Sequence, residues 1–362
     1  MLFRSKMLER IHKVRAAMPQ EVDGLLVLQP ENRRWVSGFT GTSGMAVIGR
    51  QGQPVFLTDF RYTQQAGQQC QGFDIVRHGQ EIAADIKAVL GDLGITKLGI
   101  EKDYITVGQN AKWTAEMPGI ELVPLSDILL DLRAVKDEGE LELLAEAAVI
   151  ADKAFAHILG FLKPGVSERR VALELERHMV DLGATGPSFE TIVASGVRSS
   201  MPHGVASEKL LEENDFITMD FGCIYEGYCS DMTRTVVLGT ASPRQREIYD
   251  IVLEAQLAGV RGIRAGISGK EADALTRDII AAKGYGEQFG HGTGHGVGLA
   301  IHESPRAGVT SQDTFVVNNI ITVEPGIYIP DWGGVRIEDM LVVKAGGSRN
   351  FTTSPKELIE IK

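Results

Sequence analysis

Five residues in the second half of the chain combine four carboxylates with one imidazole. They are Asp220, Asp231, His295, Glu324 and Glu338, in the phrases MDFGCIYEGYCSDMTRTVV, GHGTGHGVG, ITVEPGIY and GGVRIEDML. Hard oxygen donors with one nitrogen favour Mn, Co or Zn over copper, without choosing among the three. Four carboxylates balance two divalent ions, and two ions about 3.5–4 Å apart lower the pKa of a shared water. The set predicts a two-metal hydrolase.

The two aspartates are expected on one β-hairpin, residues 216–238, that turns at Glu226-Gly227. In this register Asp220 faces Thr233, so Asp220 and Asp231 are diagonal neighbours on one face, roughly 7–8 Å apart. Bare carboxylates this close raise each other's pKa, and a divalent cation removes that repulsion. The hairpin therefore supports a metal site.

The other three candidates are placed by strand and loop signals. Period two puts Arg336 and Glu338 on one face of a strand. Glu324 ends the apolar run IITVE, and Pro325 stops that strand directly after it. His295 lies among glycines that allow close approach of the backbone.

The length of 362 residues predicts two domains. Strands alternate with helices over residues 1–125, which indicates an α/β domain. A linker is expected at 126–137, and residues 138–362 read as an α+β domain whose antiparallel sheet carries the suspected ligands. The expected helices lie at 5–18, 80–90, 138–162, 167–183, from Ser242-Pro243 onward and 268–284, and the expected early strands at 25–30, 45–49, 54–59 and 97–101.

Composition excludes several classes of protein. The formal net charge is −11 and no basic tract is present, which argues against a nucleic-acid partner. The first residues lack the apolar core of a signal peptide, and no window reaches the ~18 apolar residues of a membrane span. Three cysteines without a CxxC pair suit a reducing compartment. Cys223 is expected to face Ser230, which leaves Cys229 on the other face, so free thiols in a cytoplasmic protein are predicted.

The phrases DFGCIYEGYCSDMTRT, GHGTGHGVG, VEPGIYIP and GGVRIED closely resemble the pita-bread metallopeptidases, above all the Xaa-Pro aminopeptidases (aminopeptidase P) and Xaa-Pro dipeptidases (prolidases). The earlier phrases ENRRWVSGFTGTSG and LTDFRYTQQA resemble the creatinase-like N-terminal domain of that subfamily. The resemblance covers nearly the whole chain. It implies a pita-bread catalytic domain, two divalent ions per chain with manganese preferred, peptide substrates with proline at position 2, and a homodimer.

The resemblance also implies a role for each candidate. Asp231 and Glu338 would bridge the two metals, Asp220 would complete one, and His295 with Glu324 the other. Glu324 would also act as general base. Three further residues would contact the substrate or the scissile amide: His203, His302 and Arg336. The implied reaction is attack by a metal-bridging hydroxide on the bond before proline.

Several alternatives stay open. The chain could be a methionine-type or broader aminopeptidase on the same fold, or a pseudo-peptidase that only binds peptides. The choice between dipeptidase and aminopeptidase is not fixed by the sequence. His291 could orient a metal ligand or bond only within its own loop. The remaining histidines are expected to be plain surface or helix residues: His12, His78, His157 and His178.

Overall fold

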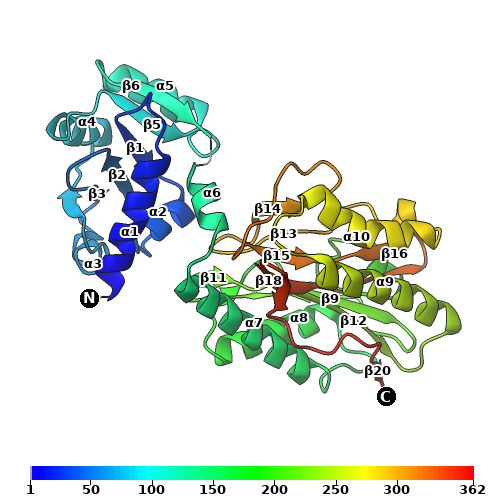
Figure 1. Ribbon diagram of the computed structural model, residues 1–362. Helices are drawn as coiled ribbons and strands as arrows, with labels where there is room; N and C mark the ends of the chain where they lie inside the picture. Colours follow the sequence, from blue (N-terminus) through cyan, green and yellow to red (C-terminus); the bar gives the residue numbers. More distant parts are fainter. Residues whose placement is uncertain (1, 127) are drawn as a thin grey trace. The chain divides into compact units, whose positions relative to one another are not determined.

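Figure 1 shows the computed structural model, which describes residues 2–126 and 128–362, without the side chains of residues 2–5. The chain forms two compact units, Met1–Arg133 and Ala134–Lys362. The segment expected as a linker contains a short helix, α6 (Ile128–Ala134), while Asp127 lies outside the described residues. Each unit is built around its own apolar core.

The first unit is a six-stranded mixed sheet with helices packed against it, in the strand order β4-β3-β2-β1-β5-β6. Strand β1 runs antiparallel to β2 and parallel to β5. Its elements are α1 (Leu2–Ala17), β1 (Gly24–Val27), α2 (Pro30–Ser37), β2 (Met45–Gly49), β3 (Val55–Thr58), α3 (Thr63–Gln69), β4 (Asp74–Arg77), α4 (Ile82–Asp92), β5 (Lys97–Glu101), α5 (Val107–Glu116) and β6 (Glu121–Leu125).

The second unit has four long helices and many short strands. Its helices are α7 (Glu138–Ile158), α8 (Glu168–Asp181), α9 (Pro243–Gly262) and α10 (Gly269–Ala282), with 3-10 turns η1 (Gly196–Ser200) and η2 (Gly286–Gln288). Its strands are β7 (Gly186–Pro187), β8 (Ile192–Ser195), β9 (Phe216–Phe221), β10 (Cys223–Tyr225), β11 (Tyr228–Cys229), β12 (Met232–Leu238), β13 (Gly294–Gly296), β14 (Glu303–Ala307), β15 (Ile320–Val323), β16 (Gly326–Ile329), β17 (Gly333–Arg336), β18 (Asp339–Lys344), β19 (Gly347–Asn350) and β20 (Glu360–Ile361).

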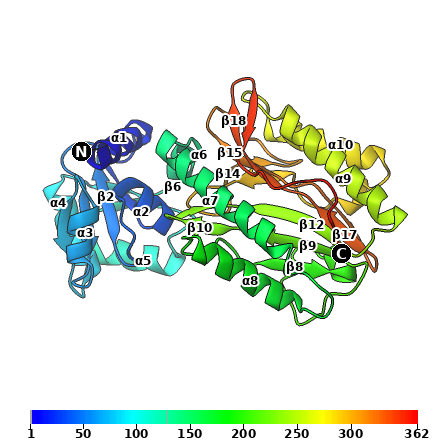
Figure 2. The ribbon, with the colours of Figure 1, turned by 90° about the horizontal axis from the view of Figure 1, so that it is seen from below.

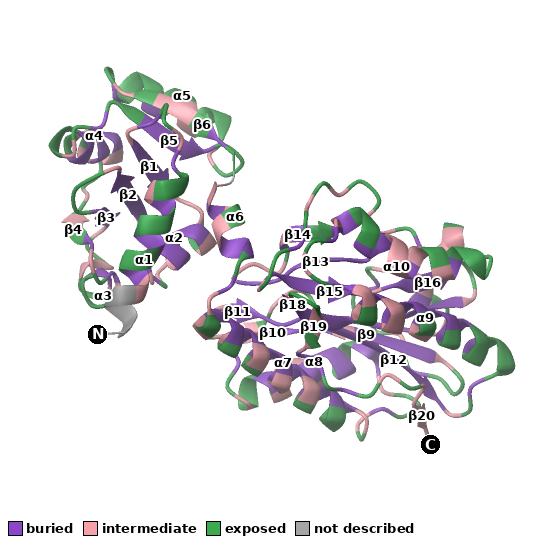
Figure 3. Ribbon diagram, viewed as in Figure 1, coloured by how far each residue is buried: buried purple, intermediate pink, exposed green. Residues whose placement is uncertain are grey.

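The strands of this unit lie between two pairs of helices, α7 with α8 and α9 with α10 (Figure 2). Apolar side chains of α7 and α8 pack with those of β8, β9 and β12. Helix α9 packs against β17 and the other side of β12, through contacts that include Val335 and Val237. Nearly all residues of these central strands are buried (Figure 3). The unit therefore has two apolar layers, with the strands between them.

Polar caps fix where the four helices begin. Ser167, Ser242 and Ser268 each accept a hydrogen bond from the third residue of the helix that follows, as the sequence indicates. Asp137 forms a capping box with Glu140 at the start of α7. Helix α7 ends at Ile158, a turn before the expected end, because Gly160 is a weak helix former.

The predicted hairpin register is confirmed. Thr233 pairs with Asp220 along the antiparallel strands β9 and β12. Glu226 and Gly227 both have positive φ, 46° and 84°, which suits a two-residue turn. The three cysteines are buried free thiols, as expected.

The expected single antiparallel sheet is wrong in one respect, since the suspected ligands come from several short sheets. Asp220 is in the β9–β12 sheet, and His295 in the two-stranded β13–β14 sheet. Strands β15 and β16 belong to different sheets, and so do β17 and β18. Pro325 has no N–H to continue the ladder after Glu324, and a second break falls at Glu338. Among the described helices, none combines the length and the apolarity that a membrane span requires.

Candidate metal centre and active site

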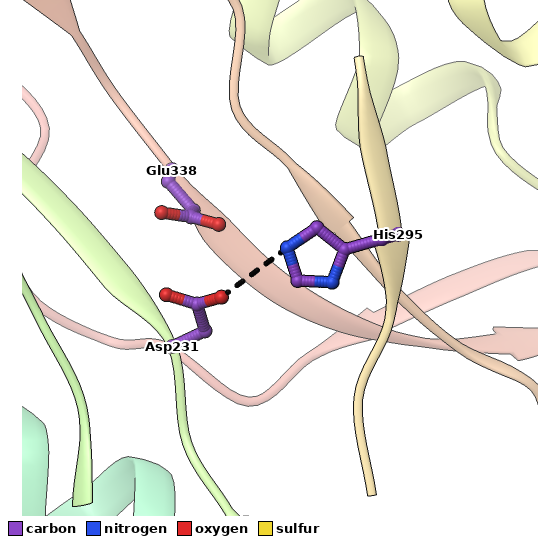
Figure 4. Close-up of side chains that lie close together, drawn as sticks. All are labelled: Asp231, His295 and Glu338. Atoms are coloured by element: carbon purple, nitrogen blue, oxygen red, sulfur yellow. Dashed lines mark ion pairs between the residues drawn. The ribbon is translucent and has the colours of Figure 1, made fainter. Parts of the chain in front are cut away.

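The five candidate ligands line one cavity of about 1050 Å³ in the second unit. Within it, Asp231, His295 and Glu338 each offer a ligand atom, and these atoms lie within 4.8 Å of one another (Figure 4). Glu324 joins this triad through an Oε1 that lies 3.4 Å from His295 Nε2. Asp220 lines the same cavity beside the triad. The structure therefore brings together all five residues that the sequence singled out.

Several of these side chains lie at the ends of strands or at interruptions between strands, and this lets them point into the same part of the cavity. Asp231 directly precedes β12, Glu324 follows β15, and Glu338 lies between β17 and β18. The backbone N–H of Glu338 donates to the carbonyl of Thr233 at 3.0 Å, which ties the break at Glu338 to the hairpin. A β-bulge follows His295 in β13. Breaks and bulges free side chains from the alternation of a regular ladder, so they can converge.

Crowding in this buried site shifts the acidic groups. Burial raises the pKa of Asp231 well above its ordinary value, and the charges of Asp220 and Glu324 raise it further. Burial also raises the pKa of Glu324 to about 8, although the Arg336 guanidinium acts against this. Burial and the charge of Asp231 raise the pKa of Glu338. A bare site of this kind resists ionisation.

The single imidazole adds another lone pair to the centre. His295 Nδ1 lies 3.0 Å from the carbonyl oxygen of Gly296, which can only accept, so Nδ1 donates. Burial lowers the pKa of His295 to about 4, so the ring is neutral near pH 7. Its Nε2 lone pair faces Asp231 Oδ2 at 3.5 Å and Glu324 Oε1 at 3.4 Å. When the two carboxylates are ionised, acceptors face acceptors here, an arrangement that a cation stabilises.

Two carboxylate oxygens give a second test of fit. Asp220 Oδ1 and Glu338 Oε1 are buried and have no hydrogen-bond partner within the described part of the chain. A buried acceptor without a partner costs about 1–3 kcal/mol, and more when it is charged. The other oxygen of each group is held, by Arg336 Nη2 at 2.6 Å and by the Thr233 hydroxyl at 2.7 Å. The free oxygens therefore fit metal ligation.

Arg336 lines the cavity, and its donors bind neighbouring protein groups. Besides Asp220, it donates from Nε to Thr233 Oγ1 at 3.0 Å and from Nη1 to Tyr328 Oη at 2.8 Å. Nη1 also donates to the carbonyl of Pro202 at 3.3 Å. These contacts fix the orientation of Asp220.

The remaining predicted histidines also line the cavity. His203 and His302 are exposed to it, and the ring of His302 packs edge-on against His295 at 4.4 Å between centroids. His291 Nδ1 donates to the carbonyl of Gly292, and His291 Nε2 accepts from Tyr328 Oη at 2.9 Å. Burial lowers the pKa of His291 to about 4. His291 thus bonds within its own loop and also holds Tyr328, beside Arg336.

Sequence reasoning missed four residues of this site. The Thr233 hydroxyl donates to Glu338, and that of Thr322 donates to Glu324 Oε1 at 3.1 Å. Both threonines lie two positions from a ligand, so period two could have identified them. Tyr328 and Arg306 also line the cavity. No local pattern marks these last two residues, because strand pairing alone brings them there.

Comparisons with known proteins identify the family to which the chain belongs. Residues 142–345 match the model of Metallopeptidase family M24, and residues 10–135 match that of the Creatinase/Prolidase N-terminal domain. A relative from Bacillus subtilis with the name Uncharacterized peptidase YqhT is 52% identical over 93% of this chain and 96% of its own.

Solved structures show the same architecture over nearly the full length of the chain. One, described as an Xaa-Pro dipeptidase from Bacillus anthracis, has a TM-score of 0.96 at 50% identity and covers 98% of this chain and 99% of its own. Another, an X-Pro aminopeptidase from Thermotoga maritima, has a TM-score of 0.89 at 36% identity, with coverage of 94% and 98%. The expected fold, a pita-bread catalytic domain after a creatinase-like domain, is confirmed. The chain belongs to metallopeptidase family M24 and is a metal-dependent hydrolase.

Proposed function

We propose that this protein is a dinuclear metallopeptidase that cleaves the bond between an N-terminal residue and a following proline. The observation that carries the proposal is the meeting of five ligand groups at the wall of one cavity, where two of their buried carboxylate oxygens have no hydrogen-bond partner among the described residues. Asp231 and Glu338 would be shared by both ions, Asp220 would serve one, and His295 with Glu324 the other. Similarity to solved proteins described as an Xaa-Pro dipeptidase and an X-Pro aminopeptidase supports the choice of substrate.

Two divalent ions, when bound, supply a Lewis acid for the scissile carbonyl and water of lowered pKa. Manganese is our choice among the ions that this donor set suits. The chain's own residues bind the substrate and transfer protons. Glu324 would take a proton of the attacking water at Oε1 and pass it to the leaving nitrogen of proline. His203 and His302 face the cavity, where an imidazole N–H can donate to the tetrahedral oxyanion or the leaving group.

Further parts of the proposal rest on the sequence and the two compact units. We place the catalytic domain at 138–362, the N-terminal domain at 1–125 and a linker at 126–137, and the division of the structure near residue 134 supports this. The three buried free thiols support a reducing, cytoplasmic location. A homodimer without membrane or nucleic-acid partners completes the proposal.

Substrate specificity is tested with protein incubated with Mn²⁺, on Ala-Pro, Ala-Pro-Ala and Met-Ala-Ala, with bound metal measured on the same sample. We expect cleavage of the two proline peptides to exceed that of Met-Ala-Ala in kcat/KM. Faster cleavage of Met-Ala-Ala would favour the methionine-type alternative. No cleavage of any peptide, together with an absence of bound metal, would favour the pseudo-peptidase.

Arg306 provides the test of dipeptidase against aminopeptidase activity. It pairs with His295 across β13 and β14 and lines the cavity, and its guanidinium has no hydrogen bond or ion pair to the described residues. A dipeptide has its carboxylate one residue past the scissile bond, where such a cation can bind it. If the enzyme is a dipeptidase, Arg306→Ala should raise KM for Ala-Pro and leave KM for Ala-Pro-Ala amide almost unchanged. Equal effects on both peptides would contradict this use of Arg306.

A further inference from the structure

The segment that carries His302 rests on a buried ion pair. Residues 297–302 join β13, which holds His295, to β14, and Glu303 follows His302 directly. Glu303 Oε2 lies 3.0 Å from Lys136 Nζ, and the two side chains are only 2% and 1% exposed. Lys136 is far away in sequence, between α6 and α7. A charged pair that is shielded from solvent therefore lies directly beside the segment 297–302, which carries His302.

The second carboxylate oxygen of Glu303 shapes the segment itself. Glu303 Oε1 accepts from the backbone N–H of Ala300 at 2.9 Å, and the carbonyl of Ala300 accepts from the N–H of Gly298 at 3.0 Å. A Cβ atom on Gly298 would collide with the Glu303 carboxylate. The backbone thus closes tightly around this carboxylate, and its position sets the path of the chain up to His302.

The position of Lys136 is itself fixed by the catalytic unit. Its N–H donates to the carbonyl of Asn318 at 3.1 Å, and Asn319 Nδ2 donates to the carbonyl of Ala134 at 2.9 Å. Loss of the ammonium group would remove the positive charge that lies 3.0 Å from the buried Glu303 carboxylate. Breaking a buried ion pair in this way is strongly destabilising, and movement of the carboxylate toward water relieves it. Such movement would displace a residue bonded directly to His302.

We propose that Lys136 is a positioning residue of the peptidase, which acts through Glu303 to hold His302 at the cavity wall. This inference rests on the proposed function, because the role of His302 belongs to it. Lys136 itself does not line the cavity.

A double-mutant comparison tests this directly. Lys136→Met, which keeps the side-chain length and removes the charge, should lower kcat/KM for Ala-Pro by about 10- to 100-fold, as loss of an orienting partner does. Lys136→Met should change the same kinetic parameter as His302→Ala, through either a lower kcat or a higher KM. In a His302→Ala background, Lys136→Met should cost nothing further. Lys136→Arg, which keeps the charge, should recover most of the activity.

Two controls separate positioning from general damage. Bound metal should match the wild type in Lys136→Met. Lys344→Met removes a lysine that donates to the Asn318 side chain at 3.0 Å without touching Glu303, and its kcat/KM should stay within about twofold. If Lys136→Met does not fold, Glu303→Gln replaces it, since the amide oxygen keeps the bond to Ala300.

The possible results distinguish the two proposals. Wild-type protein without activity on proline peptides would overturn the proposed function. An active wild type with an unaffected Lys136→Met variant would overturn the positioning role alone. So would an equal loss with and without His302, because Lys136 would then act by another route.

Discussion

At the scale of residues, the candidate metal centre consists of buried acidic side chains, and their charged forms are unfavourable unless cations are bound. Asp231, Glu324 and Glu338 all have raised pKa values, because burial disfavours their charged forms and neighbouring carboxylates add to the effect. The neutral imidazole of His295 contributes a lone pair and no charge. Affinity for divalent ions follows from this arrangement, since ions relieve both the repulsion and the desolvation.

The pH dependence of the metal-free protein follows from these shifts. The pKa of Glu324 rises from 4.5 to about 8, so the folded protein keeps a proton that the unfolded chain has released. Its stabilising contribution is complete below pH 4.5 and disappears as the pH rises through 8. The lowered pKa of His295 acts in the opposite direction, but only between about 4 and 6.5.

Between pH 6.5 and 8, therefore, the raised carboxyl pKa determines how the stability of the metal-free protein changes with pH. The free energy of unfolding of the chelated protein should fall across this interval, and added Mn²⁺ should restore more stability at pH 8 than at pH 6.5. Urea unfolding at several pH values measures both. A chelated protein whose stability rises between pH 6.5 and 8 would contradict the assigned shifts.

Asp231 is the residue whose neutral amide variant is most informative. Asp231→Asn keeps the shape and removes one negative charge from the centre of the triad. It should lower peptidase activity by at least about 100-fold, as expected when metal-assisted catalysis is lost, and reduce bound metal. Elemental analysis and peptide assays on the same sample provide the check. An Asp231→Asn enzyme with full metal content and full activity would exclude the shared-ligand role.

The sequence predicted the ligand residues better than their partners. Distinct phrases marked the four carboxylates and the one imidazole, and the structure places them together. Thr233 and Thr322 could have been identified from period two. Tyr328 and Arg306 could not, because they reach the cavity through the pairing of β16 with β17 and of β13 with β14. Pairing between distant segments has no local signature.

At the scale of elements, the hairpin was predictable and the division into sheets was not. The register of β9 and β12 followed from a two-residue turn and from the need to keep both aspartates on one face. Short helices such as α3 (TQQAGQQ) were missed, because Ala66 is the only residue of that helix that is buried. A helix with one buried residue has no apolar periodicity to recognise.

Substitution of Gly294 tests how closely β13 must approach β15. A Cβ atom there would collide with the backbone carbonyl of Thr322, and backbone cannot move aside as a side chain can. Gly294→Ala should therefore displace His295 and weaken metal binding by at least about tenfold, comparable to loss of an orienting partner. Gly347→Ala, at a glycine with open space around it, is the control and should bind metal normally. Tight metal binding by both variants would show that this approach is not required.

At the scale of the whole molecule, the cavity belongs to one of the two compact units. The first has a separate apolar core, in which Leu26, Val47 and Ile100 are buried. All residues that line the cavity belong to the second unit. Length and the alternation of strands with helices indicated two domains, while the family matches over residues 10–135 and 142–345 identify their types. The central claim, a pair of ions held by five side chains, concerns the second unit.

The most direct test of that claim is a metal titration of the chelated full-length protein. Mn²⁺ is added stepwise, and bound metal per chain and hydrolysis of Ala-Pro are measured on each sample. We predict that binding saturates at two ions per chain and that activity, absent after chelation, returns as they bind. Full hydrolysis by protein that holds no metal would contradict the account.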